Sequence, residues 1–340
     1  MATVSIYGVT CTVNAVTTLV TSALLSTPCA VVFDAAGNLY TGQAGNNDVN
    51  ILPAATATVF GVACTINTLE TLLSSGLSLP QGLCFDTAGN LYIGNGSGAS
   101  VKVLPKASGT IFGHTVVANT LYTLASSVTA LEVVNIDATG NIWVLYSTGT
   151  KLGVIPVSTG TLFGVSVTAN TFTTILSTGI TQGIDLCIDA AGNVYIADYS
   201  ANVVWVLPVA TAPIFGVSCT INTLTSLGTF AHANGICMDA AGNLYVSCTT
   251  DLKVISKTTT TLYGVACTAN VITILIATTR GHLGIDSAGN IYIGGSGALL
   301  VLAAAAWPPV PSYTGAASQA VAFATSASVP VSSAFLSFFP

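Results

Sequence analysis

The side chains best suited to ligand binding or catalysis each lie four or five residues before an Asp-x-x-Gly-Asn motif that recurs along the chain. The aspartates of the motif itself repeat in every copy, which makes them turn residues rather than candidates for chemistry. The side chains that precede the motif differ from copy to copy, and they are Cys29, Gln81, Glu132, Asp185, Asn234 and His282. The candidate ligand-binding residues are Gln81, Glu132, Asp185, Asn234 and His282.

Three members of this set, Glu132, Asp185 and His282, have side chains that bind divalent metal ions in other proteins. The set nevertheless falls at two different offsets from the motif. Because neighbouring residues of a strand point to opposite sides, the set is not expected to converge as a whole. The sequence therefore predicts a polar rim with a weak ligand site, no stoichiometric metal and no cofactor.

The sequence gives no support to a serine hydrolase. The histidines His114, His232 and His282 occupy non-equivalent positions in different repeats, and Gly-x-Ser-x-Gly is absent. That motif places the nucleophile of the α/β-hydrolases on a sharp turn. We therefore expect no catalytic residues of this kind.

Two motifs alternate along the chain, and each occurs six times. The first spans Asp34–Asn38, Asp86–Asn90, Asp137–Asn141, Asp189–Asn193, Asp239–Asn243 and Asp286–Asn290. The second is an aromatic residue followed by Gly, with Asn six residues later, and it begins at Tyr7, Phe60, Phe112, Phe163, Phe215 and Tyr263. The aspartates recur every 47 to 52 residues, a period typical of propellers and solenoids.

Each repeat is interpreted as four strands. In the second repeat the expected strands are Leu83–Phe85, Leu91–Ile93, Val101–Leu104 and Thr120–Leu124. Asp-x-x-Gly-Asn makes the turn between the first two, because Asp caps backbone N–H groups and Gly adopts a positive φ. A longer loop between the last two strands carries the aromatic-Gly motif. Alternating β-branched residues and frequent turn signals favour strands over helices.

The order of the motifs indicates how the ring closes. The chain begins with an aromatic-Gly segment that no Asp motif precedes, and its last Asp motif is followed by no aromatic-Gly segment. Residues 1–22 would therefore supply the outer strand of the last blade and remove the free sheet edges. The sequence predicts an all-β fold: a closed six-bladed β-propeller of four-stranded blades over residues 1–302, followed by an apolar tail over residues 303–340.

The residues around each turn, as in Gly183-Ile184-Asp185-Leu186-Cys187-Ile188-Asp189-Ala190-Ala191-Gly192-Asn193-Val194-Tyr195-Ile196-Ala197-Asp198, resemble the NHL repeat. The resemblance covers residues 23–302 and the N-terminal strand. It implies a propeller and leaves the function open, because NHL-like propellers include enzymes, RNA binders and scaffolds. The chain departs from the pattern in its long loop before the fourth strand, and in lacking the Arg that often follows the second strand.

Charge is scarce: 5% of the 340 residues are charged, whereas about 25% is usual in globular proteins. The six basic residues are scattered along the chain, so no basic patch is available to neutralise phosphates. The sequence therefore argues against nucleic-acid binding. A nearly neutral surface limits the solubility of a free monomer and suits a protein covered by other subunits or glycans.

The remaining sequence signals concern the cysteines and the compartment. Repeat-equivalent cysteines lie one blade apart, too far to bond, and no Cys-x-x-Cys exists, so mostly free, buried thiols are expected. The sequence contains no run of 18 apolar residues, so it predicts no transmembrane helix. An extracellular or virion-surface location fits the composition. A cytoplasmic location stays open, because the N-terminus lacks the basic region of a signal peptide.

The tail contains no charged side chain and ends with Phe335, Leu336, Phe338 and Phe339. An apolar tail of this kind needs a surface to dock on. It could pack on its own propeller or make an assembly contact with a neighbouring subunit. The leading expectation is a non-enzymatic structural propeller in an extracellular filament, surface layer or virion, self-associating through the tail. The alternatives are a ligand- or carbohydrate-binding propeller, or a metal-dependent lactonase or lyase that uses the channel mouth.

Overall fold

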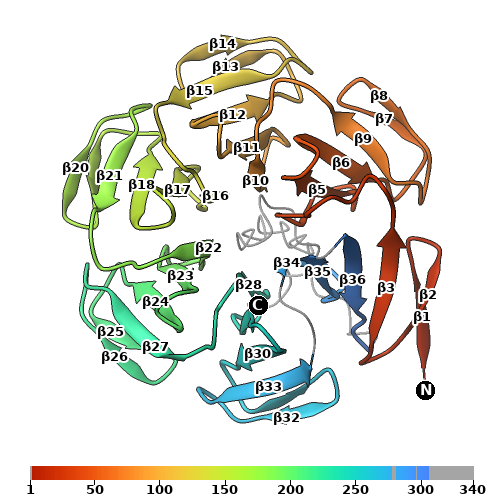
Figure 1. Ribbon diagram of the computed structural model, residues 1–340. Helices are drawn as coiled ribbons and strands as arrows, with labels where there is room; N and C mark the ends of the chain where they lie inside the picture. Colours follow the sequence, from red (N-terminus) through yellow and green to blue (C-terminus); the bar gives the residue numbers. More distant parts are fainter. Residues whose placement is uncertain (1, 278–280, 296, 306–340) are drawn as a thin grey trace, which may run out of the picture.

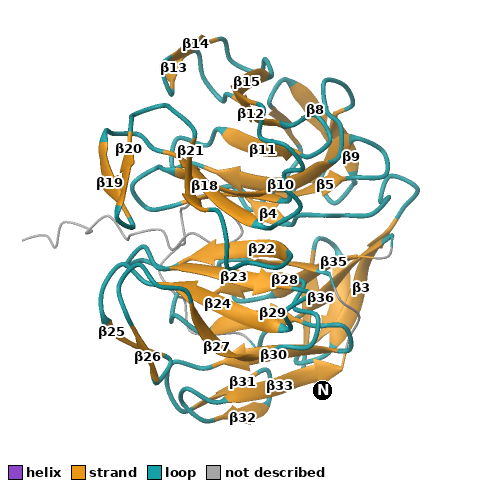
Figure 2. Ribbon diagram, turned by 60° about the vertical axis from the view of Figure 1, so that its left-hand side comes forward, coloured by secondary structure: helices purple, strands orange, loops and turns teal. Residues whose placement is uncertain are grey.

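A computed structural model describes residues 2–277, 281–295 and 297–305 of the chain. Six four-stranded antiparallel sheets stand around a central channel as the blades of a propeller (Figure 1). The described residues form strands, turns and loops without a helix (Figure 2). The all-β, six-bladed fold predicted from the repeats is confirmed.

The blades run from an inner strand at the channel to an outer strand at the circumference (Figure 1). Blades 1 to 3 are β4 (Val32–Phe33), β5 (Leu39–Gln43), β6 (Asp48–Leu52), β9 (Glu70–Leu73); β10 (Pro80–Phe85), β11 (Leu91–Asn95), β12 (Ser100–Leu104), β15 (Tyr122–Ser126); and β16 (Val133–Ile136), β17 (Ile142–Tyr146), β18 (Lys151–Ile155), β21 (Thr173–Leu176). Blades 4 to 6 are β22 (Gly183–Ile188), β23 (Val194–Asp198), β24 (Val203–Leu207), β27 (Thr225–Thr229); β28 (Gly235–Met238), β29 (Leu244–Ser247), β30 (Asp251–Ile255), β33 (Ile272–Ala277); and β34 (His282–Ile285), β35 (Ile291–Gly295), β36 (Ala298–Leu302), β3 (Val16–Thr21).

The Asp-x-x-Gly-Asn motif ties three parts of each blade together. In blade 2 one carboxylate oxygen of Asp86 accepts the Asn90 N–H at 2.8 Å, and the other accepts Asn90 Nδ2 at 2.7 Å and the Tyr92 hydroxyl at 2.9 Å. The Asn90 Oδ1 accepts the backbone N–H of Lys106, beyond the third strand, at 3.0 Å. The motif therefore fixes a turn, a core aromatic residue and the end of the third strand. The Asp and Asn recur in every blade, and the aromatic residue is Tyr in five blades and Trp143 in blade 3.

The segment that carries the aromatic-Gly motif was expected to be a loop, and this expectation is wrong. It forms a two-stranded hairpin outside each blade. The hairpins are β1 (Thr3–Ile6) with β2 (Val9–Thr12), β7 (Ala57–Val59) with β8 (Val62–Cys64), β13 (Gly109–Ile111) with β14 (His114–Val116), β19 (Gly160–Leu162) with β20 (Val165–Val167), β25 (Ala212–Ile214) with β26 (Val217–Cys219), and β31 (Thr260–Leu262) with β32 (Val265–Cys267). In the tip at Phe60-Gly61, φ is 47° and 84°, the two positive values that a two-residue type I′ turn needs.

Each hairpin tip lies against the next blade. A Cβ added to Gly61 would lie 3.6 Å from Nδ2 of Asn119, the asparagine that follows the next hairpin. The same contact recurs around the molecule as Gly8–Asn67, Gly61–Asn119, Gly113–Asn170, Gly164–Asn222, Gly216–Asn270 and Gly264–Asn14. We call these six hairpins and asparagines the outer ring. It joins neighbouring blades at the circumference, as the packed sheets join them inside.

The ring closes at the predicted position. β3 pairs antiparallel with β36, with Val16 opposite Leu302 and Thr21 opposite Ala298. The outer strand of blade 6 thus comes from residues 16–21, and closure of the propeller by the N-terminal strand is confirmed. Tyr7 at the tip of the first hairpin packs edge-on against Tyr292 of the same blade, with ring centroids 6.5 Å apart.

Residues 306–340 lie outside the described residues, and with them the expected assembly residues Phe335, Leu336, Phe338 and Phe339. Tail docking therefore stays a prediction. All nine cysteines are free and buried. In the described residues no helix is long and apolar enough to span a membrane.

Candidate functional site

All five candidate ligand-binding residues lie in or directly before inner strands, at one mouth of the central channel, and four of them form two pairs. Gln81 lies in β10 of blade 2, and Glu132 directly precedes β16 of blade 3. Asp185 lies in β22 of blade 4, and His282 begins β34 of blade 6. Inner strands bring these residues together because all six converge on the channel (Figure 1).

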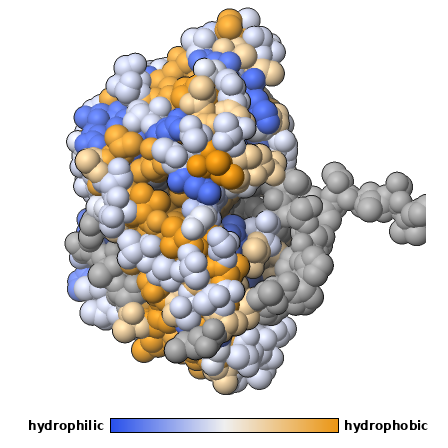
Figure 3. All heavy atoms as spheres, turned by 90° about the vertical axis from the view of Figure 1, so that its right-hand side faces the viewer, coloured by the Kyte–Doolittle hydropathy of each residue, from blue (hydrophilic) through white to orange (hydrophobic). Residues whose placement is uncertain are grey.

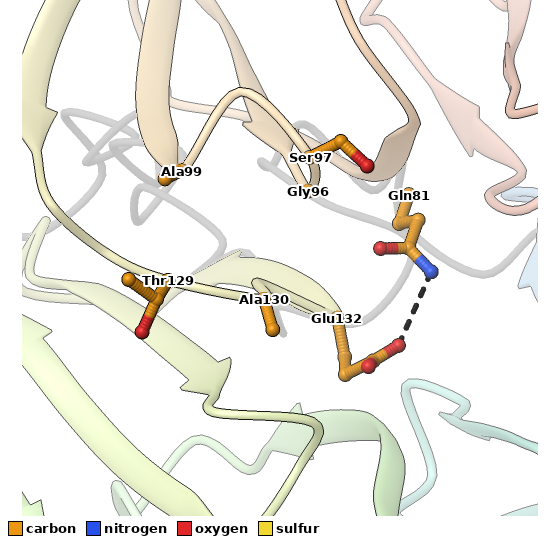
Figure 4. Close-up of a pocket in the computed structure, with 7 residues that line it drawn as sticks. All are labelled: Gln81, Gly96, Ser97, Ala99, Thr129, Ala130 and Glu132. Atoms are coloured by element: carbon orange, nitrogen blue, oxygen red, sulfur yellow. Dashed lines mark hydrogen bonds between the residues drawn. The ribbon is translucent and has the colours of Figure 1, made fainter.

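Gln81 and Glu132 join blades 2 and 3. The Gln81 amide donates a hydrogen bond from Nε2 to Oε2 of Glu132 at 3.1 Å (Figure 4). Gln81 is the extra residue of a bulge, since Pro80 pairs with Asn95 and Gly82 with Gly94. A bulge redirects the side chain of its unpaired residue, and here that side chain reaches the next blade. A Cβ on Gly96 would meet Oε1 of Gln81 and would lie 2.9 Å from the backbone oxygen of Leu131, so glycine leaves room for this placement.

Burial raises the pKa of the Glu132 carboxyl, and this effect exceeds two opposing influences. The hydrogen bond from Gln81 and the positive charge that His282 can carry both lower this pKa. Glu132 therefore keeps its proton to a higher pH than a solvated glutamate does.

Asp185 links blades 4, 5 and 6. It is 5% exposed, and its Oδ1 accepts the N–H of Leu186 at 2.8 Å while its Oδ2 accepts the N–H of Ile236 in β28 at 3.1 Å. The same Oδ2 lies 3.8 Å from Nδ1 of His282, close enough for charge attraction when the imidazole is protonated. The carboxylate is thereby held rigidly beside a half-buried histidine.

The remaining two members of the variable set contribute differently. Asn234 directly precedes β28, where its N–H donates to Ser247 O at 2.9 Å. Its side chain makes no hydrogen bond within the described residues. Cys29 is 7% exposed and its Sγ donates to Thr27 O at 3.0 Å. Burial raises the pKa of the Cys29 thiol to about 11, so this thiol is protonated and a poor nucleophile at neutral pH.

The donor set does not fit a resident metal ion. In the described part of the chain no three His, Cys, Asp or Glu side chains lie close enough to hold one. Both oxygens of Asp185 already accept backbone N–H groups, and Glu132 Oε2 accepts Gln81. These atoms are committed to the protein, so we derive no chemical step through a metal.

A cavity of about 430 Å³ opens beside Gln81 and Glu132, between blades 2 and 3 (Figure 4). It is lined by Gln81, Gly96, Ser97, Ala99, Thr129, Ala130 and Glu132. The turn between β11 and β12 supplies one wall, and the loop that leads into β16 supplies the other. Sequence reasoning missed the wall residues Ser97 and Thr129, because small polar residues in turns carry no distinctive signal.

Comparison with known proteins shows similarity in fold alone. No protein-family profile matches the sequence, and no curated protein matches it, so the NHL resemblance is confirmed only as a propeller. One similar solved structure carries a provisional gluconolactonase assignment, with a TM-score of 0.58, 10% identity, and coverage of 84% of this chain and 90% of the other. A gluconolactonase from Xanthomonas campestris has a TM-score of 0.58 and 13% identity, with coverage of 84% of this chain and 88% of the other. A streptogramin B lyase has a TM-score of 0.53 and 11% identity, with coverage of 84% of this chain and 96% of the other.

Proposed function

We propose that this protein is an acid–base enzyme that opens a small, uncharged lactone at the channel mouth. The observation that carries the proposal is that Glu132, whose pKa is raised by burial, and the Asp185–His282 pair lie at the same channel mouth. General acid–base catalysis needs two groups of this kind, one holding a proton and one able to accept one.

His282 acts as the general base. It takes a proton from the water that attacks the lactone carbonyl, and Asp185 stabilises the imidazolium that forms. Glu132 acts as the general acid and gives its proton to the ring oxygen as the ring C–O bond breaks. The product is a hydroxy acid. Gln81 occupies Oε2 of Glu132, which leaves Oε1 to carry the transferred proton.

The similar structures support this choice over a non-enzymatic assembly. Their names are those of gluconolactonases and a lyase, in agreement with the enzyme alternative considered for the sequence. At 10% to 13% identity this support concerns the fold, and the activity depends on the side chains at the mouth.

The test is titration of released acid with a panel of γ- and δ-lactones and the full chain. Glu132→Gln and His282→Asn should each lower kcat by about 100-fold or more, the usual size of an acid or base contribution. His114→Asn is the matched control, because His114 is exposed in the outer hairpin β14. Absence of lactone hydrolysis by the unaltered protein, or full activity of both variants, would contradict the proposal.

A structural subunit is the second candidate, and exposed apolar side chains at the circumference favour it. Ile66, Val117, Ile221 and Val271 are 45% to 55% exposed, and each follows an outer hairpin. Figure 3 shows one side of the molecule on which strongly hydrophilic residues form only small, separate patches. Size-exclusion chromatography with negative-stain imaging tests this candidate: filaments or rings would support it, and a monomer at high concentration would contradict it.

A further inference from the structure

We propose that the cavity between blades 2 and 3 is the specificity pocket, and that it binds an uncharged, hydroxylated ring of monosaccharide type. This inference rests on the proposed function, since it assigns the substrate class of the same site. The cavity volume of about 430 Å³ lies within the usual range for small-molecule sites.

The polar groups of the pocket favour a ligand rich in hydroxyl groups. The Oε1 atom of Gln81 and the hydroxyl groups of Ser97 and Thr129 accept or donate no hydrogen bond within the described residues. Gln81 and Glu132 lie at one end of the pocket, and Ala99 and Thr129 lie at the other (Figure 4). A hydroxylated ring could use these groups in place of water.

The same lining disfavours an anion. None of the seven lining residues is basic, and Glu132 adds negative charge whenever it loses its proton. A phosphate or carboxylate on the ligand would therefore lose its hydration without gaining a cationic partner. The pocket should consequently admit a neutral lactone and release the acid that ring opening produces.

Between blades 4 and 5, two aromatic side chains occupy the positions that correspond to Gly96 and Ala130 of the pocket. Tyr199 is the first residue after β23, as Gly96 is after β11, and His232 lies three residues before β28, as Ala130 does before β16. The Tyr199 and His232 rings pack together between blades 4 and 5, with centroids 4.7 Å apart. Between blades 2 and 3 both positions lack a ring, and a hollow remains.

This comparison supplies a substitution that closes the pocket with little risk to the fold. Ala130 and His232 share the left-handed backbone conformation, with φ of 46° and 52°, and both are exposed. Ala130→His would therefore place in the pocket a side chain that the same loop accepts in blade 5. Thr27→His is the matched control, since Thr27 has φ of 58° and also lies seven residues before its turn aspartate.

The experiment measures binding of unreactive probes to the full chain by ligand-observed NMR and calorimetry. D-glucose should bind, while D-gluconate and glucose 6-phosphate should bind at least about tenfold more weakly. Ala130→His should weaken glucose binding by at least about tenfold, and Thr27→His should leave it unchanged. Equal or tighter binding of the anions, no binding of glucose, or an unchanged affinity in Ala130→His would overturn the assignment.

One further variant separates failure of the pocket from failure of the proposed reaction. His282→Asn should lose lactone turnover and keep its glucose affinity within about twofold, because His282 does not line the pocket. Glucose binding that depends on position 130 in a protein without lactonase activity would support the pocket and reject the reaction. Turnover that is unaffected by Ala130→His would retain the reaction and reject the pocket.

Discussion

The outer ring and the channel mouth are built from the same six repeats, yet they follow opposite rules. At the outer ring an aromatic-Gly tip and an Asn recur six times, and each tip makes the same contact with its neighbour. At the mouth the corresponding positions hold different side chains, and only some of them interact. A contact that closes a ring must be satisfied at every junction. A ligand site has no such requirement and needs asymmetry to bind one molecule in one orientation.

The Asp motifs and the channel mouth also differ in how completely polar groups are paired. In the Asp motifs, which connect the two innermost strands of each blade, carboxylate, amide and hydroxyl groups bond to each other. At the mouth, Asn234 and one oxygen of Gln81 have no partner within the described residues, and burial raises the pKa of Glu132. Gln81 and Asn234 are half-buried, so water can pair with these groups and a ligand can replace that water.

The largest expected effect comes from removing residues 1–22. This deletion takes away β3 and the first hairpin, which leaves β36 paired with β35 alone and breaks the outer ring at two junctions. Loss of cooperative folding or aggregation is expected, because the outer edge of β36 is newly exposed. Circular dichroism melting and size-exclusion chromatography measure it, and an unchanged thermal midpoint would show that the ring does not need this strand.

A large effect is also expected from Asp86→Ala in the blade 2 motif. The change removes the acceptor of two Asn90 groups and of the Tyr92 hydroxyl, which is 2% exposed. Leaving buried donors unpaired should lower the free energy of unfolding by about 2–4 kcal/mol. The matched comparison is Glu132→Ala, which also removes an acidic side chain, but at the mouth. This substitution should change the free energy of unfolding by less than about 1 kcal/mol. Equal losses in denaturant titrations would remove the distinction between the regions.

A smaller effect of opposite sign is expected from Glu132→Gln. Because burial raises the pKa of Glu132 in the folded chain, this residue favours folding most when protonated, and that advantage is lost as the pH rises through the folded pKa. The variant should gain on the order of 0.5 kcal/mol at pH 7, after allowance for solvent screening, and nothing at pH 3. Denaturant midpoints at the two pH values test this, and a gain that does not depend on pH would assign the effect to packing.

The smallest effect on the propeller is expected from ending the chain at Ala305. This end keeps the bond from Asn14 N–H to the carbonyl of buried Ala303 and the bond from Ala304 N–H to Asn290 Oδ1, so the thermal midpoint should shift by no more than about 2 °C. If the tail connects subunits, as the sequence led us to expect, self-association should disappear at the same time. A truncated chain that assembles like the full chain would show that the tail is not the connector.

The blades could be predicted from the sequence, because a turn such as the one at Asp86 and Gly89 depends only on residues that are neighbours along the chain. It was insufficient for the outer hairpins, since strands as short as Gly109–Ile111 and His114–Val116 show little alternation. At the mouth, the two offsets indicated that the set does not converge as a whole, and each observed pair joins residues of one offset, Gln81 with Glu132 and Asp185 with His282. A register shift between Gly183 and Asp185 in β22 changes which residue of that strand pairs with β23. Contacts of this kind depend on bulges and on blade packing, which neighbouring residues along the chain do not encode.

The pairing of β3 with β36 affects the order in which the protein can be completed. During synthesis β3 is made early, but its partner is translated only after five blades. Until then the partly made ring has an open seam, and the segment of residues 16–21 must wait without a partner. This pairing joins segments far apart in the sequence, so its closure is expected to be slow. The same seam is where thermal opening should begin, and a protease that cuts near Thr21 during heating would report it.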